Sequence, residues 1–204
     1  ALSILSAIWV WAVIQWPKTW LSVPSYVFAA VVLHTVMKFW LASEACYRFV
    51  EDRKSSALEL LLSTPISVKE ILHGQRLALF RQFAGPAIYV LVADFIFLIL
   101  GLRGTDLNQS DEKSFWVMLW LAGMTVFVMD LFALSWVSMW VGLSSKKANR
   151  AANASIARIM VLPWLAFFLL ITMLATSSLL TKIHLDEHVV LILWFALAVA
   201  NNLI

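Results

Sequence analysis

Three charged side chains, Lys38, Asp94 and Asp130, lie inside long apolar runs of the sequence. A charge in hydrocarbon costs at least a few kcal/mol unless it is paired or hydrated, so such residues are candidates for an ion or substrate path. Counted from the outer ends of their helices, Lys38 and Asp130 both lie about 20 Å deep and can pair, whereas Asp94 lies about 12 Å deep. We favour a buried structural pair, or Lys38 reaching the inner surface, over a translocation site. Asp94 is expected to reach water at the outer leaflet.

Histidine and carboxylate residues near the C-terminal end form the second group that could do chemistry. His184, Asp186, Glu187 and His188 have ligand-type side chains, and the i,i+4 histidines could hold a metal on one helical face. A short polar loop between two membrane helices explains the same residues, and we prefer that explanation and predict no metal site. His34 stands alone on an apolar helix, so it is expected to be a hydrogen-bonded packing residue rather than a haem ligand.

These residues belong to a chain with the composition of a membrane protein. Hydrophobic residues make up 62% and charged residues 13%, with a mean hydropathy of +0.87, well outside the range of soluble domains. The apolar runs reach or approach the roughly 20 residues that cross about 30 Å of hydrocarbon. They cover residues 1–16, 24–42, 77–102, 115–143, 154–176 and 188–204. We predict an all-α membrane protein with six transmembrane helices in one domain.

The first and last runs are short and coincide with the ends of the sequence, so we expect a fragment of a longer chain with truncated end helices. No basic region or cleavage site precedes the first run, and a signal peptide is not expected. Pro86 and Pro163 lie inside the third and fifth runs, where a missing backbone hydrogen bond permits a kink or a static bend.

Lys and Arg are concentrated in the connections after the second and fourth runs. By the positive-inside rule both connections face the cytoplasm, so both chain ends do too, in the inner (plasma) membrane of the cell. The basic residues that carry this assignment are Arg48, Arg53, Lys54, Lys69, Arg76 and Arg81, then Lys146, Lys147, Arg150 and Arg158. The positive charge therefore reflects membrane topology, and nucleic-acid binding is not expected. The lone cysteine, Cys46, cannot form an internal disulfide.

The first cytoplasmic connection, residues 44–76, is far longer than a turn between two helices requires. The second run is expected to continue as a helix past Glu44 into the sequence Tyr47 to Val50. A short amphipathic helix then begins near Ser55 or Ser56, with an apolar stripe of Leu58, Leu61 and Leu62, and ends at Thr64-Pro65. Ser67 and Glu70 have capping-box spacing and predict the start of the next helix. This arrangement favours a docking element for a partner, although a helix lying among the lipid headgroups has the same pattern.

The connection also resembles a known family. Its residues Glu51-x-Arg53-x-x-Ser56-x-Leu58-Glu59-x-Leu61-Leu62-x-Thr64-Pro65-Ile66-Ser67-x-x-Glu70-Ile71-x-x-Gly74 are similar to the cytoplasmic signature of the type-2 family of ABC transporter permeases. The similarity extends to Ser144-Ser145-Lys146-Lys147-Ala148-Asn149-Arg150-Ala151-Ala152 and to Leu162-Pro163-Trp164. The family usually has Gly where this chain has Ser56, and Lys where it has Gln75.

The resemblance implies a coupling helix between the second and third membrane helices, resting in a groove of a separate ATPase subunit. The implied docking residues are Arg53, Ser56, Leu58, Glu59, Leu61, Leu62, Thr64 and Pro65, with Glu70 and Gly74 shaping the start of the third membrane helix. It also implies an exporter working as a homodimer or with a related permease subunit.

No Gly-x-x-x-x-Gly-Lys-Ser/Thr loop occurs in the sequence, so this chain is not expected to bind nucleotide phosphates. ATP and magnesium are expected on the partner subunit, and no cofactor is expected on this chain. The protease motifs His-Glu-x-x-His and Gly-x-Ser-x-Gly are missing too, and we do not expect an enzyme. The alternative function is a non-transporting membrane anchor or assembly subunit that recruits a cytoplasmic partner through the same helix.

Overall fold

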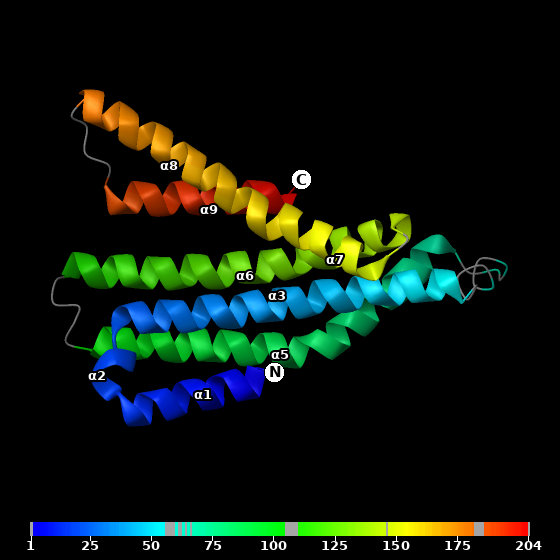
Figure 1. Ribbon diagram of the computed structural model, residues 1–204, viewed down its shortest axis with the longest axis horizontal. Helices are drawn as coiled ribbons and strands as arrows, with labels where there is room; N and C mark the ends of the chain where they lie inside the picture. The colour runs from blue at the N-terminus through cyan, green and yellow to red at the C-terminus, as the bar shows by residue number, and fades with distance from the viewer. Residues whose placement is uncertain are drawn as a thin grey trace. The chain divides into compact units, whose positions relative to one another are not determined.

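The computed structural model describes residues 2–55, 60, 63, 65, 67–104, 110–145, 147–181 and 186–203, and in these ranges all regular structure is helical (Figure 1). The helices are α1 (Leu2–Gln15), α2 (Pro17–Trp20), α3 (Val23–Lys54), α5 (Val68–Arg103), α6 (Ser110–Ser144), α7 (Ala148–Ile156), the π-helical segment Ala157–Val161, α8 (Leu162–Thr181) and α9 (Glu187–Leu203). The prediction of an all-α protein is confirmed.

Four of the helical stretches are long and apolar enough to cross a membrane. They are Val23–Arg48, Val68–Arg103, Ser110–Ser144 and Ala148–Thr176, which coincide with the four longest apolar runs. These helices indicate a multi-pass membrane protein. The first and last runs form α1 and α9, of 14 and 17 residues, and a count of six spans stays a prediction.

The chain divides into two compact units, which are described separately. Unit 1 comprises Ala1–Leu41 and Ser55–Met124, and unit 2 comprises Ala42–Lys54 and Thr125–Ile204. The helices α3 and α6 each contribute residues to both units. The prediction that the chain is one domain stays a prediction.

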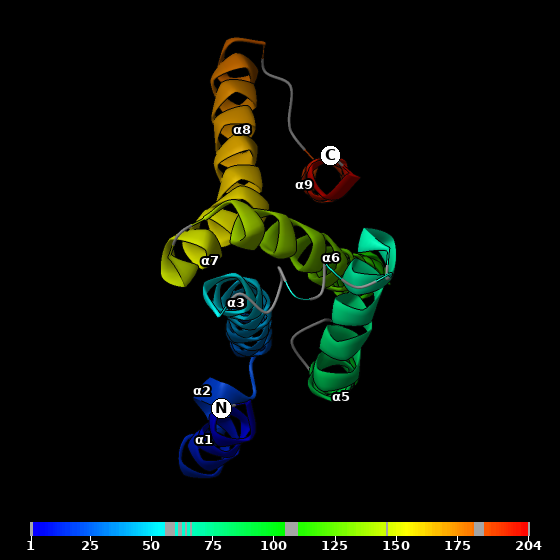
Figure 2. The same cartoon turned by 90° about the vertical axis from the view of Figure 1, so that its right-hand side faces the viewer.

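Aromatic side chains join α1, α3 and α5 in unit 1. The Trp9 ring lies with its centroid 5.1 Å from Phe97 and 6.4 Å from Tyr26, and Tyr26 stacks on Phe97 at 5.8 Å. Because each of the three rings comes from a different helix, the helices must sit at the corners of a triangle, as the end-on view shows (Figure 2). Such pairs contribute about 0.5–1.5 kcal/mol each beyond the area that they bury.

The start of α6 packs on the end of α5 through Trp116, which is 2% exposed. The Trp116 indole N–H donates to the carbonyl oxygen of Leu98 at 3.1 Å. Its ring lies against Gly101, where an added Cβ atom would be 2.5 Å from three ring atoms. Glycine is therefore required here by the close approach of the ring.

Small residues make the contacts around Cys46 in unit 2. Cys46 is 0% exposed and packs with Ala151 and Ala152 of α7. Its Sγ atom lies 3.3 Å from the carbonyl oxygen of Ser138 on α6. Small side chains allow helices to approach closely, which is how membrane helices associate without a hydrophobic driving force.

The two internal prolines have different effects. In α5 the helix continues through Pro86 and bends along its length (Figure 1). Before Pro163 the helix widens to the π-helical segment, in which Leu162 N–H bonds to the carbonyl oxygen of Ala157. Pro163 has no N–H to offer the carbonyl of Ile159, and Asn201 on α9 donates to that carbonyl at 3.5 Å. The kink or static bend expected at Pro163 stays a prediction; the structure shows a π-helical segment just before this residue.

Candidate functional site

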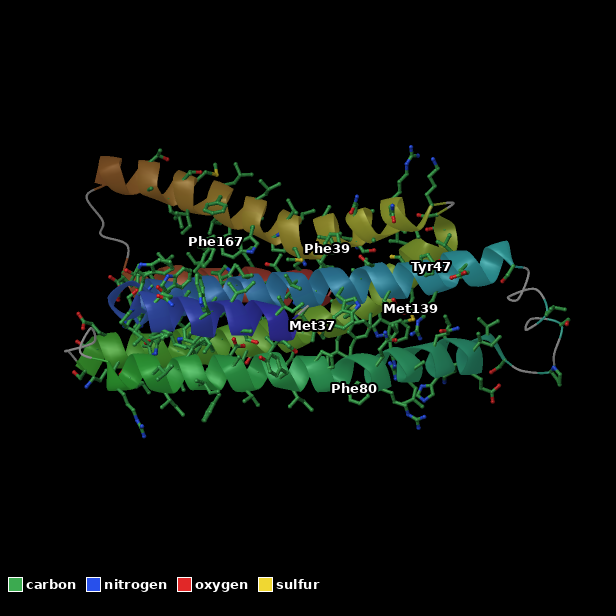
Figure 3. All side chains as sticks on the ribbon, turned by 60° about the horizontal axis from the view of Figure 1, so that its bottom comes forward. Met37, Phe39, Tyr47, Phe80, Met139 and Phe167 are labelled. Atoms are coloured by element: carbon green, nitrogen blue, oxygen red, sulfur yellow. The ribbon has the colours of Figure 1, made fainter. Side chains whose placement is uncertain are left out.

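The predicted docking segment is preceded by a helix that extends well beyond a membrane crossing. The 32 residues of α3 span about 48 Å, against about 30 Å of hydrocarbon. The predicted continuation past Glu44 is therefore confirmed, and Tyr47 lies on it (Figure 3). Glu44 pairs with Arg48 one turn later at 3.1 Å. Arg53 lies in the last turn of α3, and its side chain lies outside the described part of the structure.

Most residues of the predicted coupling helix lie outside the described residues, namely Ser56, Leu58, Glu59, Leu61, Leu62 and Thr64. The helix and its docking role stay predictions. Within the segment, Ser63 donates its hydroxyl hydrogen to the carbonyl oxygen of Leu60 at 2.7 Å, and Pro65 lies at an exposed bend.

The far end of the segment is fixed by the capping box at the start of α5. The backbone N–H of Ser67 donates to Glu70 Oε2 at 2.8 Å, and the backbone N–H of Glu70 donates to Ser67 Oγ at 3.3 Å. The Ser67 hydroxyl also donates to Glu70 Oε2, at 2.7 Å. The predicted capping box is confirmed. Gly74, one turn further on, has nothing within 4 Å of an added Cβ atom, so its surroundings are open.

Apolar side chains are exposed on both sides of the bend at Pro65. Leu60 is 68% exposed and Val68 is 58% exposed. On the predicted topology these two residues face the cytoplasm, where contact with water gives them no stabilisation. Single exposed apolar side chains are common on protein surfaces, so the docking role of this pair stays a prediction.

Inside the predicted membrane region, the structure pairs Asp94 of α5 with His34 of α3. His34 Nε2 lies 2.7 Å from Asp94 Oδ2, and the Asp94 side chain is 0% exposed. The expectation that Asp94 reaches water at the outer leaflet is wrong, because helix packing in unit 1 encloses the carboxyl group. The expectation that His34 forms a hydrogen bond is confirmed.

Sequence reasoning missed this pair, although one signal could have found it. His34 lies 11 residues from the start of α3 and Asp94 lies 9 residues from the end of α5, depths of about 16 and 14 Å at 1.5 Å per residue. Antiparallel neighbours at equal depth can meet. A comparison of the depths of the charged residues Lys38, Asp94 and Asp130 does not include His34, because histidine is counted as neutral at pH 7.

The other two intramembrane charges lie in different units. Asp130, in unit 2, is 6% exposed and accepts a hydrogen bond from Asn202 Nδ2 of α9, a partner that the sequence did not suggest. Lys38, in unit 1, is 9% exposed and lies one turn after His34 on α3. A direct pair between Lys38 and Asp130 stays a prediction.

For metal binding, the described ranges contain no group of three or more His, Cys, Asp or Glu side chains that could hold an ion. His184, part of the sequence pattern with metal-ligand spacing, lies outside the described residues. The candidate site features in the described ranges are thus of three kinds. They are the Ser67–Glu70 cap at the start of α5, the exposed apolar side chains of Leu60 and Val68, and the buried hydrogen bonds of Asp94 and Asp130.

No protein-family model, no curated protein and no solved structure matches this chain.

Proposed function

We propose that this chain is the membrane-spanning permease subunit of an ATP-driven exporter of the type-2 ABC family, coupled to a separate ATPase subunit. Two features carry the proposal. The helices α3 and α5 are both longer than a membrane crossing requires, and the connection between them ends at the capping box of α5, with the apolar side chains of Leu60 and Val68 exposed. α3 and α5 span about 48 and 54 Å, so each exceeds a 30 Å hydrocarbon layer. Both overhangs adjoin residues 55–67, the segment with the coupling-helix pattern.

The helix α5 can carry a displacement of the docking segment into unit 1. A flexible loop absorbs displacement, whereas a continuous helix carries displacement along its axis. The Ser67–Glu70 capping box starts α5 at a fixed residue, and α5 then continues as one helix to Arg103. Further along, α5 contacts α1 through Phe97 and α3 through Asp94. A partner that moves the docking segment would thereby move the helices of unit 1 together.

The partner supplies the nucleotide chemistry in this proposal. ATP and magnesium bind to the ATPase subunit, and the permease binds neither. A second permease subunit, identical or related, completes the translocation path, because ATPase subunits of this kind act in pairs and each needs a docking site. The proposal gives this chain no catalytic residue.

Co-purification tests the docking step. The tagged full-length protein is isolated in mild detergent from cells that express it naturally, and the bound fraction is examined for a protein that hydrolyses ATP and carries a Gly-x-x-x-x-Gly-Lys-Ser/Thr loop. Leu60→Asp, Leu61→Asp and Glu59→Arg should each reduce its recovery at least tenfold. Leu203→Asp, the same change at a leucine that is 77% exposed on α9, is the matched control and should retain the ATPase. Failure to recover an ATPase with the wild type contradicts the proposal.

A non-transporting anchor uses the same docking segment, and turnover separates the two functions. In proteoliposomes, the ATPase rate of a transporter depends on the permease conformation and rises with a transported compound. A panel of lipids and amphipathic compounds therefore provides the probes. Stimulation by any of them, abolished by Leu60→Asp, supports the transporter, whereas a constant rate with an intact complex supports the anchor.

A further inference from the structure

The buried contact between His34 and Asp94 satisfies only half of the Asp94 carboxyl group. Oδ2 lies 2.7 Å from His34 Nε2. Oδ1 is enclosed, and among the described residues no group lies within hydrogen-bonding distance of it. A carboxylate has acceptor sites on both oxygens, and an oxygen left unbonded in a buried place has lost its hydration without gaining a hydrogen bond. The arrangement is therefore unusual for a permanently ionised aspartate.

A single proton lowers the cost of burying this group, because a neutral carboxylic acid is buried more readily than a carboxylate. With the proton on Asp94 Oδ1, the group is a neutral acid, and the N–H of a neutral His34 ring donates to Oδ2. An ionised Asp94 beside a protonated His34 holds the same number of protons and has the same net charge of zero. Loss of the proton leaves one negative charge inside the predicted hydrocarbon region, which the low dielectric opposes. The pair thus has two states that differ by one proton and one charge.

We propose that His34 and Asp94 form a proton-binding site inside the membrane, which carries one exchangeable proton on Asp94 Oδ1 when it is occupied. The ligand is the proton itself, because Oδ1 has no hydrogen-bond partner among the described residues, which also contain no group of three or more His, Cys, Asp or Glu side chains that could hold a metal ion. On release the proton passes to water, and Asp94 keeps its hydrogen bond from His34. The site joins α3 to α5, so its occupancy changes the charge between two helices of unit 1.

The neighbouring helices carry few other titratable groups. On α3, Lys38 lies one turn beyond His34. On α5, Tyr89 lies just over one turn before Asp94, and its phenol oxygen is hydrogen-bonded to Ser6 Oγ of α1. In unit 1 Tyr26 of α3 stacks on Phe97 of α5, and the described residues of α1 carry no titratable side chain. Asp94 and His34 are thus the groups in direct contact.

The proposal does not depend on transport or on an ATPase, so the purified chain suffices as the sample. Infrared difference spectra of the full chain in lipid nanodiscs are recorded from about pH 4 to about pH 9, a range that brackets ordinary carboxyl and imidazole titration. The C=O stretch of a protonated carboxylic acid should disappear as the pH rises. The chain has 12 Asp and Glu residues, so exposed carboxyl groups also contribute to the band near pH 4. Asp94→Asn should remove one component of this band, and Asp130→Asn, the matched control, should leave that component unchanged.

His34→Gln provides a second arm, because the glutamine amide can still donate to Oδ2 while the imidazole is gone. The band should then persist and shift in frequency. ¹³C-labelled aspartate in otherwise wild-type protein also assigns the band to aspartate, which keeps the test valid where Asp94→Asn fails to fold. The proposal is overturned where Asp94→Asn removes no component of the aspartate band, or where no component of that band shifts with His34→Gln. The first result means that Asp94 is a fixed carboxylate that only holds the helices together, and the second means that the proton site does not include His34.

Discussion

Gly101→Ala is the sharpest test of the packing in unit 1. The added Cβ atom would lie 2.5 Å from three atoms of the Trp116 ring, whereas carbon atoms pack best at about 3.5–4.0 Å. The ring must therefore move by about 1 Å. Because Trp116 is buried and bonded to the carbonyl oxygen of Leu98, this movement also strains or breaks a hydrogen bond.

The cost follows from three contributions. Overpacking of this kind destabilises by about 1–3 kcal/mol. Loss of the indole hydrogen bond adds about 1 kcal/mol. Alanine recovers about 1 kcal/mol relative to glycine within a helix. Gly101→Ala should therefore lower the free energy of unfolding by about 1–3 kcal/mol.

Gly123 on α6 provides the matched control, since an added Cβ atom there meets nothing within 4 Å. Gly123→Ala should leave the free energy of unfolding unchanged or raise it by up to about 1 kcal/mol. Unfolding is followed by far-UV circular dichroism as dodecyl sulfate is added to mixed micelles. Gly101→Ala should cost less in a Trp116→Leu background than in the wild type, because that background lacks the ring that clashes. Equal stability of the two alanine variants would refute the packing of Trp116 on Gly101.

Three further predictions concern the cap, the π-helical segment and the buried thiol. Ser67→Ala should speed hydrogen exchange of the first-turn amides of α5, because it removes the side-chain acceptor of the cap, whereas Ser63→Ala should not. Asn201→Leu should lower the free energy of unfolding of unit 2 by about 1–3 kcal/mol, because it removes the side-chain donor to the carbonyl of Ile159, to which Pro163 cannot donate. Pro163→Ala should reduce this loss, as measured by unfolding in dodecyl sulfate. A maleimide should label Cys46, which is 0% exposed, at least tenfold faster after unfolding than in micelles; equal rates would contradict its burial.

The helices were largely predictable because hydrocarbon imposes a simple rule on the sequence. Apolar runs of sufficient length must be helical, since every backbone group has to be bonded internally. The ends of α3 and α5 followed from local chemistry, namely the polar continuation after Glu44 and the Ser67–Glu70 cap. These features depend on residues within one or two turns, which the sequence displays directly.

Contacts between helices were less predictable, because hydropathy carries no information about rotation or partners. Asp94 was recognised as unusual from its type, but its burial and its pairing with His34 depend on how α3 and α5 face each other. Asn201 and Asn202 resemble ordinary polar residues at a helix end. Their roles appear only when α9 lies beside the carbonyl of Ile159 and the carboxyl group of Asp130.

We propose that residues 55–67 dock on an ATPase subunit. Site-specific photocrosslinking in native membranes tests this docking without detergent. A photoreactive amino acid is placed at Leu60, which is 68% exposed, and at Leu203, which is 77% exposed, as the control position. We expect illumination to link position 60, and not position 203, to a protein that carries a Gly-x-x-x-x-Gly-Lys-Ser/Thr loop and hydrolyses ATP. Crosslinks from position 60 to lipid alone would contradict the claim and would place the segment among the headgroups.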